Sequence, residues 1–292
     1  TTETPIQSVE EHMFIKKNIN LSVLREDVLH EHISGNKFRK LKYQLIEAAQ
    51  SEVDTLISFG GAFSNHLVAL AYAGKRFGFK TIGVVRGDEL KGKPLNPSLK
   101  FCSECGMQLE FVPREVYRQK EQADQVVTLK LAHPNAIIIP EGGTNRLAVK
   151  GCAELLTAGH HNYDVITCAV GTGGTIAGLI TAAEKYQTIL GFSALKGDFL
   201  SDQVSTLITE PSTNWHITDA YAFGGYAKTS PRLMAFIRQF HERHELLLEP
   251  IYTGKMFFGI YDLIQQGYFS TGTKILAVHS GGLQSWGGFE GV

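Results

Sequence analysis

The stretch DVITCAVGTGGTIAGLITAAEKY, residues 164–186, contains one complete unit of a fold. Its first part, 164–171, is apolar and rich in β-branched residues, which predicts a buried strand. Glycines follow directly, and 175–186 has the composition of a helix. A strand that passes through glycines into a helix is typical of α/β proteins with mainly parallel strands. It also leaves backbone N–H groups free at the start of the helix, where they can bind an anion.

The same alternation extends along the rest of the chain. Further strands are predicted at 53–60, 81–87, 109–113, 136–143, 216–225 and 274–282. Helices are predicted at 65–78, 115–132 and 147–159, and an exposed loop at 91–100. Because several strands end in glycines that run into helices, and open parallel sheets bind ligands beyond the carboxyl ends of their strands, we expect a small-molecule site assembled from distant segments.

The glycine loop at 171–175 does not match the common nucleotide motifs. A dinucleotide fingerprint requires glycine or alanine where Ile176 stands, and a Walker loop requires a Gly-Lys-Ser/Thr sequence that is absent. Two interpretations remain, namely a cradle for a single phosphomonoester and a glycine-rich turn that only packs.

A second segment, Ser58 to His66, combines glycines with polar residues. It lacks the glycines of the G-x-S-x-G nucleophile elbow. Ser64 fits the N-cap of a helix that Asn65 and His66 begin. Hydroxyl, amide and backbone N–H groups at such a position can also be presented to an anionic ligand.

The third segment is EHISGNKFRKLKYQL, residues 31–45. Lys40 and Lys42 are predicted to lie on a solvated helix face, and Arg39 is left open. Lys37 differs because it follows a Gly-Asn turn. A buried lysine has a lowered pKa and can form a Schiff base with a carbonyl.

Composition narrows the function classes. The 292 residues carry a net charge of −1, which gives no general attraction to nucleic acid or to an acidic membrane. No apolar stretch approaches the roughly 20 residues of a membrane-spanning helix. Four cysteines in a chain of this length do not form a disulfide framework, and a cytoplasmic location is expected.

Together, these segments resemble the fold-type II enzymes that depend on pyridoxal 5′-phosphate (PLP). Within them the chain is similar to the family of 1-aminocyclopropane-1-carboxylate (ACC) deaminase and D-cysteine desulfhydrase. The blocks that carry the resemblance occur in family order: Arg25-Glu26-Asp27, Gly35-Asn36-Lys37-x-Arg39-Lys40-Leu41, Gly60-Gly61-x-x-Ser64-Asn65-His66, the loop 171–175, Gly225-Tyr226, Glu249-Pro250-x-Tyr252-Thr253-Gly254-Lys255 and His279-Ser280-Gly281-Gly282.

The resemblance implies a role for each candidate residue. Lys37 would hold PLP covalently, Asn65 would bond the ring O3′, and Ser280 would face the pyridine nitrogen. The phosphate would be held by the backbone of Gly171, Thr172, Gly173, Gly174 and Thr175. Lys37, Ser64, Tyr226 and Tyr252 would be catalytic, and the amino-acid substrate would be bound by Ser64, Asn65, His66, Tyr226 and Tyr252. Without the resemblance, core packing is the simpler interpretation of the two tyrosines.

It also implies a tryptophan synthase β-like fold with two open, twisted, mostly parallel sheets flanked by helices. A large PLP-binding domain would comprise 1–42 and 140–292, with a small α/β domain inserted at 43–139, and the protein would be a homodimer.

Two positions depart from the family pattern. Ser34 replaces one of two glycines, and Thr253 stands where ACC deaminases carry an acidic residue. Thr253 favours D-cysteine desulfhydrase chemistry over ACC deamination. The remaining alternatives are another PLP-dependent lyase and a PLP-binding protein without turnover.

Overall fold

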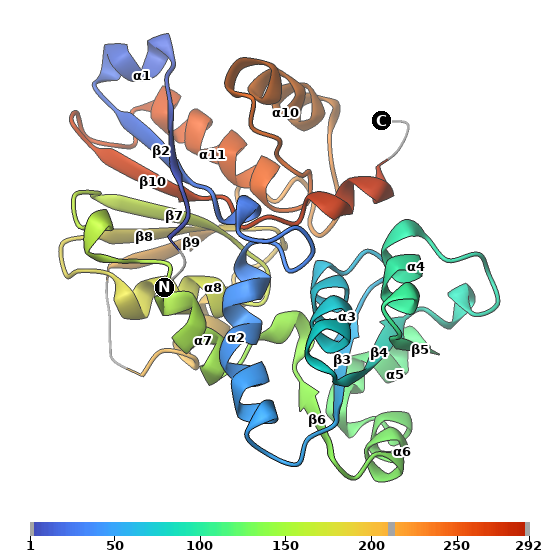
Figure 1. Cartoon of the computed structure of the whole chain (residues 1–292). Coiled ribbons are helices and arrows are strands. Elements are labelled where there is room, and N and C mark those ends of the chain that lie inside the picture. The colour runs from blue at the N-terminus through green and yellow to red at the C-terminus, as the bar shows by residue number, and fades with distance from the viewer. Residues whose placement is uncertain (1–2, 210–213, 290–292) are drawn as a thin grey trace.

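The computed structural model describes residues 3–209 and 214–289, which form two separate sheets (Figure 1). The larger has the order β1-β2-β10-β7-β8-β9, and all of its neighbouring strands are parallel except β1 and β2. Its strands are β1 (Ile6–Val9), β2 (Asn20–Leu24), β7 (Val165–Val170), β8 (Thr188–Ser193), β9 (Trp215–Thr218) and β10 (Lys274–Val278). The smaller, β5-β4-β3-β6, is entirely parallel. Its strands are β3 (Thr55–Gly60), β4 (Lys80–Arg86), β5 (Gln108–Val112) and β6 (Ala136–Ile139). The predicted fold class is confirmed.

Helices cover both faces of each sheet. On the larger sheet, α1 (His12–Lys17), α10 (Pro231–His244) and α11 (Thr253–Gln266) pack on one face, and α7 (Arg146–Ala153), α8 (Gly174–Ala182) and α9 (Phe199–Ser205) on the other. On the smaller, α2 (Asn36–Ala49), α3 (Asn65–Phe77) and α4 (Pro97–Glu104) lie opposite α5 (Arg114–Gln119) and α6 (Asp124–Ala132). Burial on both faces explains why the strands are continuously apolar rather than alternating.

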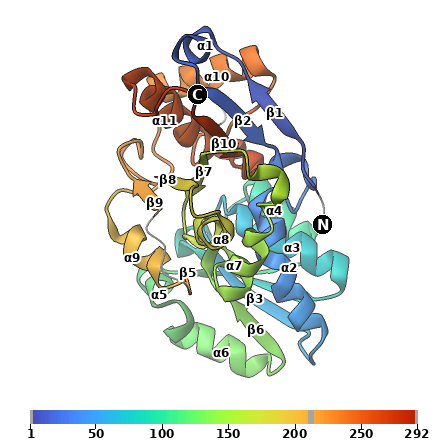
Figure 2. The ribbon, with the colours of Figure 1, turned by 90° about the vertical axis from the view of Figure 1, so that its left-hand side faces the viewer.

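Helix α2 lies between the two halves of the molecule, as Figures 1 and 2 both show. Its Leu41 is buried in the core of the smaller sheet. Its other side packs closely on α7, where a Cβ on Gly151 would lie only 2.0 Å from the carbonyl oxygen of Arg39. The helix therefore crosses the predicted boundary at residue 43, and the division into 1–42, 43–139 and 140–292 stays a prediction.

The predicted loop at 91–100 is wrong in its second half. Residues 91–94 are exposed, but α4 begins at Pro97, and Ser98 and Leu99 are buried. The helix starts there because Asn96 caps it by accepting a hydrogen bond from the Leu99 N–H, and because proline is well tolerated at the first helical position.

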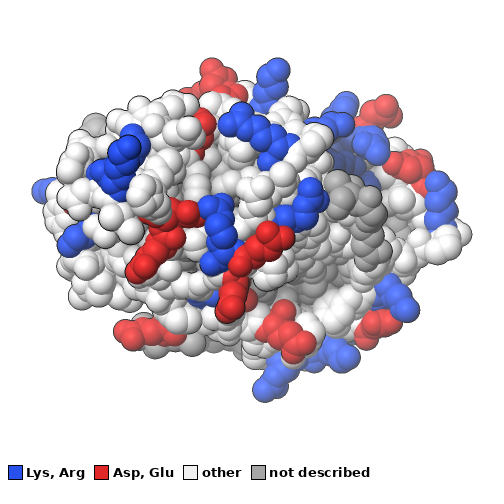
Figure 3. All heavy atoms as spheres, turned by 90° about the horizontal axis from the view of Figure 1, so that it is seen from above, with Lys and Arg blue, Asp and Glu red and all other residues white. Residues whose placement is uncertain are grey.

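Charged side chains of both signs are scattered over the face drawn in Figure 3. Within 3–209 and 214–289, the helices are too short or too polar to cross a membrane.

Candidate active site

A cavity of about 320 Å³ collects the predicted residues from both halves of the chain. Strands β3, β7 and β10 all end beside it, as expected for a site at the carboxyl edges of parallel sheets. Of the predicted residues, its lining includes Lys37, Ser64, Asn65, His66, Gly171, Thr172, Gly173, Thr175, Tyr226, Tyr252 and Ser280. Gly174, which begins α8, is buried beside it. Their chemical roles stay predictions.

Lys37 reaches the cavity because α2 begins against the chain that follows β10. Gly35 has φ +61°, and a Cβ there would lie 1.9 Å from the carbonyl oxygen of Ser280. That oxygen accepts a hydrogen bond from the Asn36 N–H at 3.2 Å. Only glycine fits this approach and this backbone conformation. The contact fixes Lys37 and Ser280 in one cavity.

The Lys37 amine is held by an amide and has no carboxylate partner within ion-pair distance in the described part of the chain. Its Nζ donates to Asn36 Oδ1 at 2.9 Å, and Asn36 Nδ2 donates to Thr175 Oγ1 at 2.8 Å. Asn36 thus links the amine to the glycine loop. Burial, and then repulsion by Lys40, lowers the pKa of Lys37 to about 7. A large fraction of this amine is therefore neutral and nucleophilic near neutral pH.

The prediction that Lys40 lies on a solvated face is wrong. The residue is 3% exposed, and its Nζ donates to Gly142 O, Thr144 Oγ1 and Thr172 Oγ1 at 3.0–3.2 Å. Lys40 faces the cavity because it is one helical turn from Lys37. Burial lowers its pKa, and its partners are neutral oxygens. A cation thus lies against the glycine loop.

The glycine loop enters α8 as the sequence predicts. Gly173 has φ +80° and precedes the first turn of the nine-residue helix. The cradle is tight, since a Cβ on Gly174 would meet Thr144 Oγ1 at 2.9 Å and one on Gly171 would meet the Tyr252 ring at 3.1 Å. A helix N-terminus next to a buried lysine favours a phosphate.

The start of α3 forms the opposite wall. Ser64 is its N-cap, accepting from the Leu67 N–H at 3.2 Å, so the predicted cap is confirmed. Asn65 Oδ1 and His66 Nδ1 are buried without a hydrogen-bond partner in the described structure. His66 Nε2 lies 2.7 Å from Ser58 Oγ, and burial holds the pKa of His66 well below its usual value, so this ring is neutral. Unpartnered buried polar atoms are rare and point to a missing ligand.

Tyr226 and Tyr252 approach edge to face, with ring centroids 6.2 Å apart. Burial is the main cause of a raised pKa in both residues. The pKa of Tyr226 is raised, and that of Tyr252 is raised well above its usual value. Both phenols therefore stay protonated at neutral pH, which is the form that can donate a proton or a hydrogen bond.

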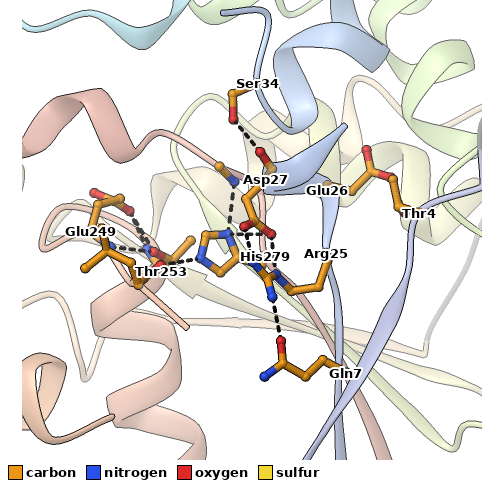
Figure 4. Close-up of polar contacts among 11 residues, drawn as sticks. Thr4, Gln7, Arg25, Glu26, Asp27, Ser34, Glu249, Thr253 and His279 are labelled. Atoms are coloured by element: carbon orange, nitrogen blue, oxygen red, sulfur yellow. Dashed lines mark hydrogen bonds and ion pairs between the residues drawn. The ribbon is translucent and has the colours of Figure 1, made fainter. Parts of the chain in front are cut away.

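A buried polar cluster anchors the loop that carries Ser280 (Figure 4). His279 Nε2 donates to the Leu247 carbonyl at 2.8 Å, and its Nδ1 accepts from the Gly281 N–H. Burial lowers the pKa of His279, which agrees with this neutral tautomer. Asp27 lies 3.5 Å from the ring and is held by Arg25 through two hydrogen bonds of 2.7–2.8 Å. The Arg-Glu-Asp motif therefore supports the Ser280 loop.

Thr253 is not part of the cavity lining. It is fully buried, and both its N–H and its hydroxyl contact Glu249 Oε1. Glu249 also accepts from the Ile251 and Tyr252 N–H groups, so it caps α11. Any influence of Thr253 on the substrate acts through the position of Tyr252.

Sequence reasoning missed several residues of the site. The most informative are Asn36, Lys40, Phe63, Arg86, Glu141 and Gly142. The spacing of Lys37 and Lys40, three residues apart on a predicted helix, was a usable signal. No local pattern marks Arg86 or Glu141, which come to the site only when the strands β4 and β6 pair with β3.

Comparisons with known proteins agree with this geometry. The family model described as "Pyridoxal-phosphate dependent enzyme" matches residues 2–281. A putative 1-aminocyclopropane-1-carboxylate deaminase of Pyrococcus horikoshii is 30% identical over 96% of this chain and 90% of its own length. A protein of Arabidopsis thaliana, named bifunctional D-cysteine desulfhydrase/1-aminocyclopropane-1-carboxylate deaminase, mitochondrial, is 27% identical over 90% of this chain and 72% of its own. The crystal structure of an ACC deaminase homologue superposes with a TM-score of 0.85 at 27% identity, covering 98% of this chain and 91% of that one.

Proposed function

The chain belongs to the family of pyridoxal-phosphate dependent enzymes and is an ACC deaminase-like member of it; on this premise, we propose that it converts D-cysteine to pyruvate, sulfide and ammonia. The cavity carries the amino-acid chemistry of this proposal, and Thr253 carries the choice of D-cysteine. The cavity combines an amine of lowered pKa, two protonated phenols and a helix N-terminus backed by a lysine.

The residues present fit PLP. The N–H groups at the start of α8, with Lys40 beside them, suit its phosphate. Asn65 Oδ1, which has no hydrogen-bond partner among the described residues, suits a polar ring substituent. Ser280 would meet the pyridine nitrogen with a neutral hydroxyl, which leaves that nitrogen largely unprotonated and makes the ring a milder electron sink than a carboxylate partner would.

When bound, the cofactor supplies an aldehyde that takes up the substrate amino group and a conjugated ring that delocalises charge at Cα. In the proposed reaction Lys37 Nζ removes the Cα proton of D-cysteine. The Cβ–S bond then breaks and the thiolate leaves. Hydrolysis of the remaining three-carbon unit consumes one water and gives pyruvate and ammonia.

The surrounding side chains would bind and orient the amino acid. Ser64 and Asn65 lie at the N-terminus of α3, where free N–H groups favour a carboxylate. Tyr226 and Tyr252 would donate protons or hydrogen bonds to the leaving group, because both phenols are protonated. His66, held neutral, would add a hydrogen bond without adding charge.

ACC is the second candidate substrate. The name of the Pyrococcus horikoshii relative gives ACC alone, and the name of the Arabidopsis thaliana relative gives both D-cysteine and ACC. It has no Cα proton, so its ring would be opened by a nucleophile such as Ser64 or by removal of a β-proton near Lys37. The products would be 2-oxobutanoate and ammonia. The preference for D-cysteine rests on Thr253.

The test is to incubate the purified holoenzyme with D-cysteine, L-cysteine and ACC, and to measure pyruvate, sulfide and 2-oxobutanoate. We expect pyruvate and sulfide in equal amounts from D-cysteine. Turnover of ACC alone would reverse the preference, and turnover of neither would refute both assignments.

We also propose that the enzyme is a homodimer and works in the cytoplasm. Family resemblance supports the first, and the four cysteines, all of which are free thiols, support the second. Sedimentation analysis and localisation of a tagged protein test them.

A further inference from the structure

A second cavity, of about 290 Å³, adjoins the first. It is lined by Arg86, Arg114, Tyr117, Arg118, Lys120 and Glu141. Arg86, at the end of β4, and Glu141, just after β6, line both cavities, so the two cavities meet at these side chains. A ligand bound at Lys37 therefore has this basic compartment as its neighbour.

The cations of the second cavity are only partly neutralised. Lys120 pairs with Glu141 at 2.7 Å, and Arg114 pairs with Glu89 at 2.7 Å. Arg86 and Arg118 line the same space, and neither has a carboxylate within ion-pair distance in the part of the chain that the structure describes. Two positive charges are thus in excess around one cavity.

Tyr117 and Glu141 give this compartment a fixed floor. Tyr117 is 3% exposed, and its hydroxyl donates to Glu141 Oε1. Lys120 Nζ lies 3.5 Å from the centre of the Tyr117 ring, and the Arg86 guanidinium lies 5.7 Å from it. These cation–π contacts hold the cations beside the cavity without supplying a negative charge.

The field of Arg86 reaches both compartments. Burial lowers the pKa of Lys120, and the charge of Arg86 adds to this decrease. The same charge acts on Tyr226 in the first cavity, where it opposes the rise in the phenol pKa that burial causes. The positive charge of Arg86 therefore acts on residues of both cavities, Lys120 in the second and Tyr226 in the first.

We propose that this second cavity receives the anionic side chain of a further class of amino-acid substrate, which carries a carboxylate or a sulfonate where D-cysteine carries its thiol, with Arg86 and Arg118 as its partners. The inference rests on the proposed function, because it assumes that the amino group of the bound amino acid lies beside Lys37. Guanidinium groups suit such oxyanions because their N–H donors match two oxygens at once. The chain would then bind a small amino acid with an acidic side chain more tightly than its neutral counterpart.

The test compares D-aspartate with D-asparagine, which differ in charge but hardly in size, by calorimetric titration of the holoenzyme. We expect D-aspartate to bind about tenfold more tightly than D-asparagine at low salt. This factor is at the lower end of the range for charge-assisted hydrogen bonds, because the arginines are partly exposed. The preference should shrink as salt is added, because exposed charges are screened.

Variants locate the effect. Arg118→Gln should reduce the preference for D-aspartate to about twofold or less, because one charge-assisted contact is lost. The affinity for D-asparagine should not change. Arg118→Lys should keep part of the preference. Arg86→Gln should also reduce it. Arg238→Gln, an exposed arginine of α10, is the matched control and should change nothing.

Equal affinities in the unaltered enzyme, no binding of either ligand, or a preference that survives in both Arg118→Gln and Arg86→Gln would overturn the proposal. D-cysteine turnover is measured in parallel. Turnover without a charge preference would refute the anionic subsite alone, whereas a charge preference without turnover would refute the proposed reaction alone.

Discussion

Two faces of helix α2 use the same kinds of side chain in different ways. On one face Arg39 pairs with buried Glu26 at 2.8 Å, and Lys42 pairs with Glu154 at 2.6 Å. On the other, Lys37 and Lys40 bond only to neutral oxygens among residues 3–209 and 214–289. Cations paired with carboxylates hold the helix in place, whereas cations left without them remain available for an anionic cofactor. A basic stretch in a sequence is therefore better divided by helical face than treated as one charged surface.

The largest effect is expected on the cavity face. Lys37→Ala should lower turnover of D-cysteine by about 10³-fold or more, since it removes both the covalent attachment and the proposed base. The absorption band of the lysine-bound cofactor should vanish as well. Lys42→Ala is the control and should keep both. An unchanged spectrum in Lys37→Ala would contradict the proposed attachment site.

The paired face should respond in stability instead. Arg39→Met leaves the fully buried Glu26 without its main cation, which should lower the free energy of unfolding by about 3–5 kcal/mol. Denaturant titration measures this. Adding Glu26→Gln to Arg39→Met should recover part of the loss, because the uncompensated charge is gone. If Arg39→Met were as stable as the unaltered protein, the division between the two faces would fail.

Lys40→Met should act on cofactor affinity. Loss of a cation beside the phosphate cradle removes a charge-assisted hydrogen bond worth about 1.5–3 kcal/mol, so PLP should bind about 10–100-fold more weakly. Equilibrium dialysis of the apoenzyme with PLP gives the constant. Lys42→Met serves as the matched control, and equal losses in the two variants would show a general effect of charge.

Much of this site could be predicted from the sequence because its parts are local. The Ser64 cap depends on a few neighbouring residues, and the positive φ of Gly35 requires only a glycine, but the contact that places Gly35 against Ser280 comes from the far end of the chain. Lys40 was misjudged because its oxygen partners come from Gly142, Thr144 and Thr172, more than 100 residues away.

Other errors have a similar origin. The predicted helix at 115–132 is divided into α5 and α6 because Lys120 has φ +52°. The stretch contains no glycine that would have predicted this conformation. Strand β8 escaped prediction, and only its pairing with β7 and β9 reveals it. Long-range pairing, rather than local preference, decides this strand.

The smallest effect concerns pH and tests how the two cavity-face lysines interact. The neutral Lys37 amine is the form that reacts with an aldehyde, and its pKa in the apoenzyme is lowered to about 7. The rate at which the apoenzyme attaches PLP should therefore rise about tenfold between pH 6 and pH 8 and level off above, since deprotonation increases the reactive fraction. Stopped-flow absorbance measures this rate at a saturating PLP concentration.

Repulsion by Lys40 is the second cause of that lowered pKa, after burial. In Lys40→Met the midpoint of the pH profile should consequently move upward, so that attachment at pH 7 slows even when PLP saturates the site. Lys42→Met should leave the midpoint where it is, because Glu154 already neutralises that side chain. A midpoint that stays near 7 in Lys40→Met would mean that burial alone sets the pKa of Lys37. The two lysines would then share a helix face without sharing an electrostatic role.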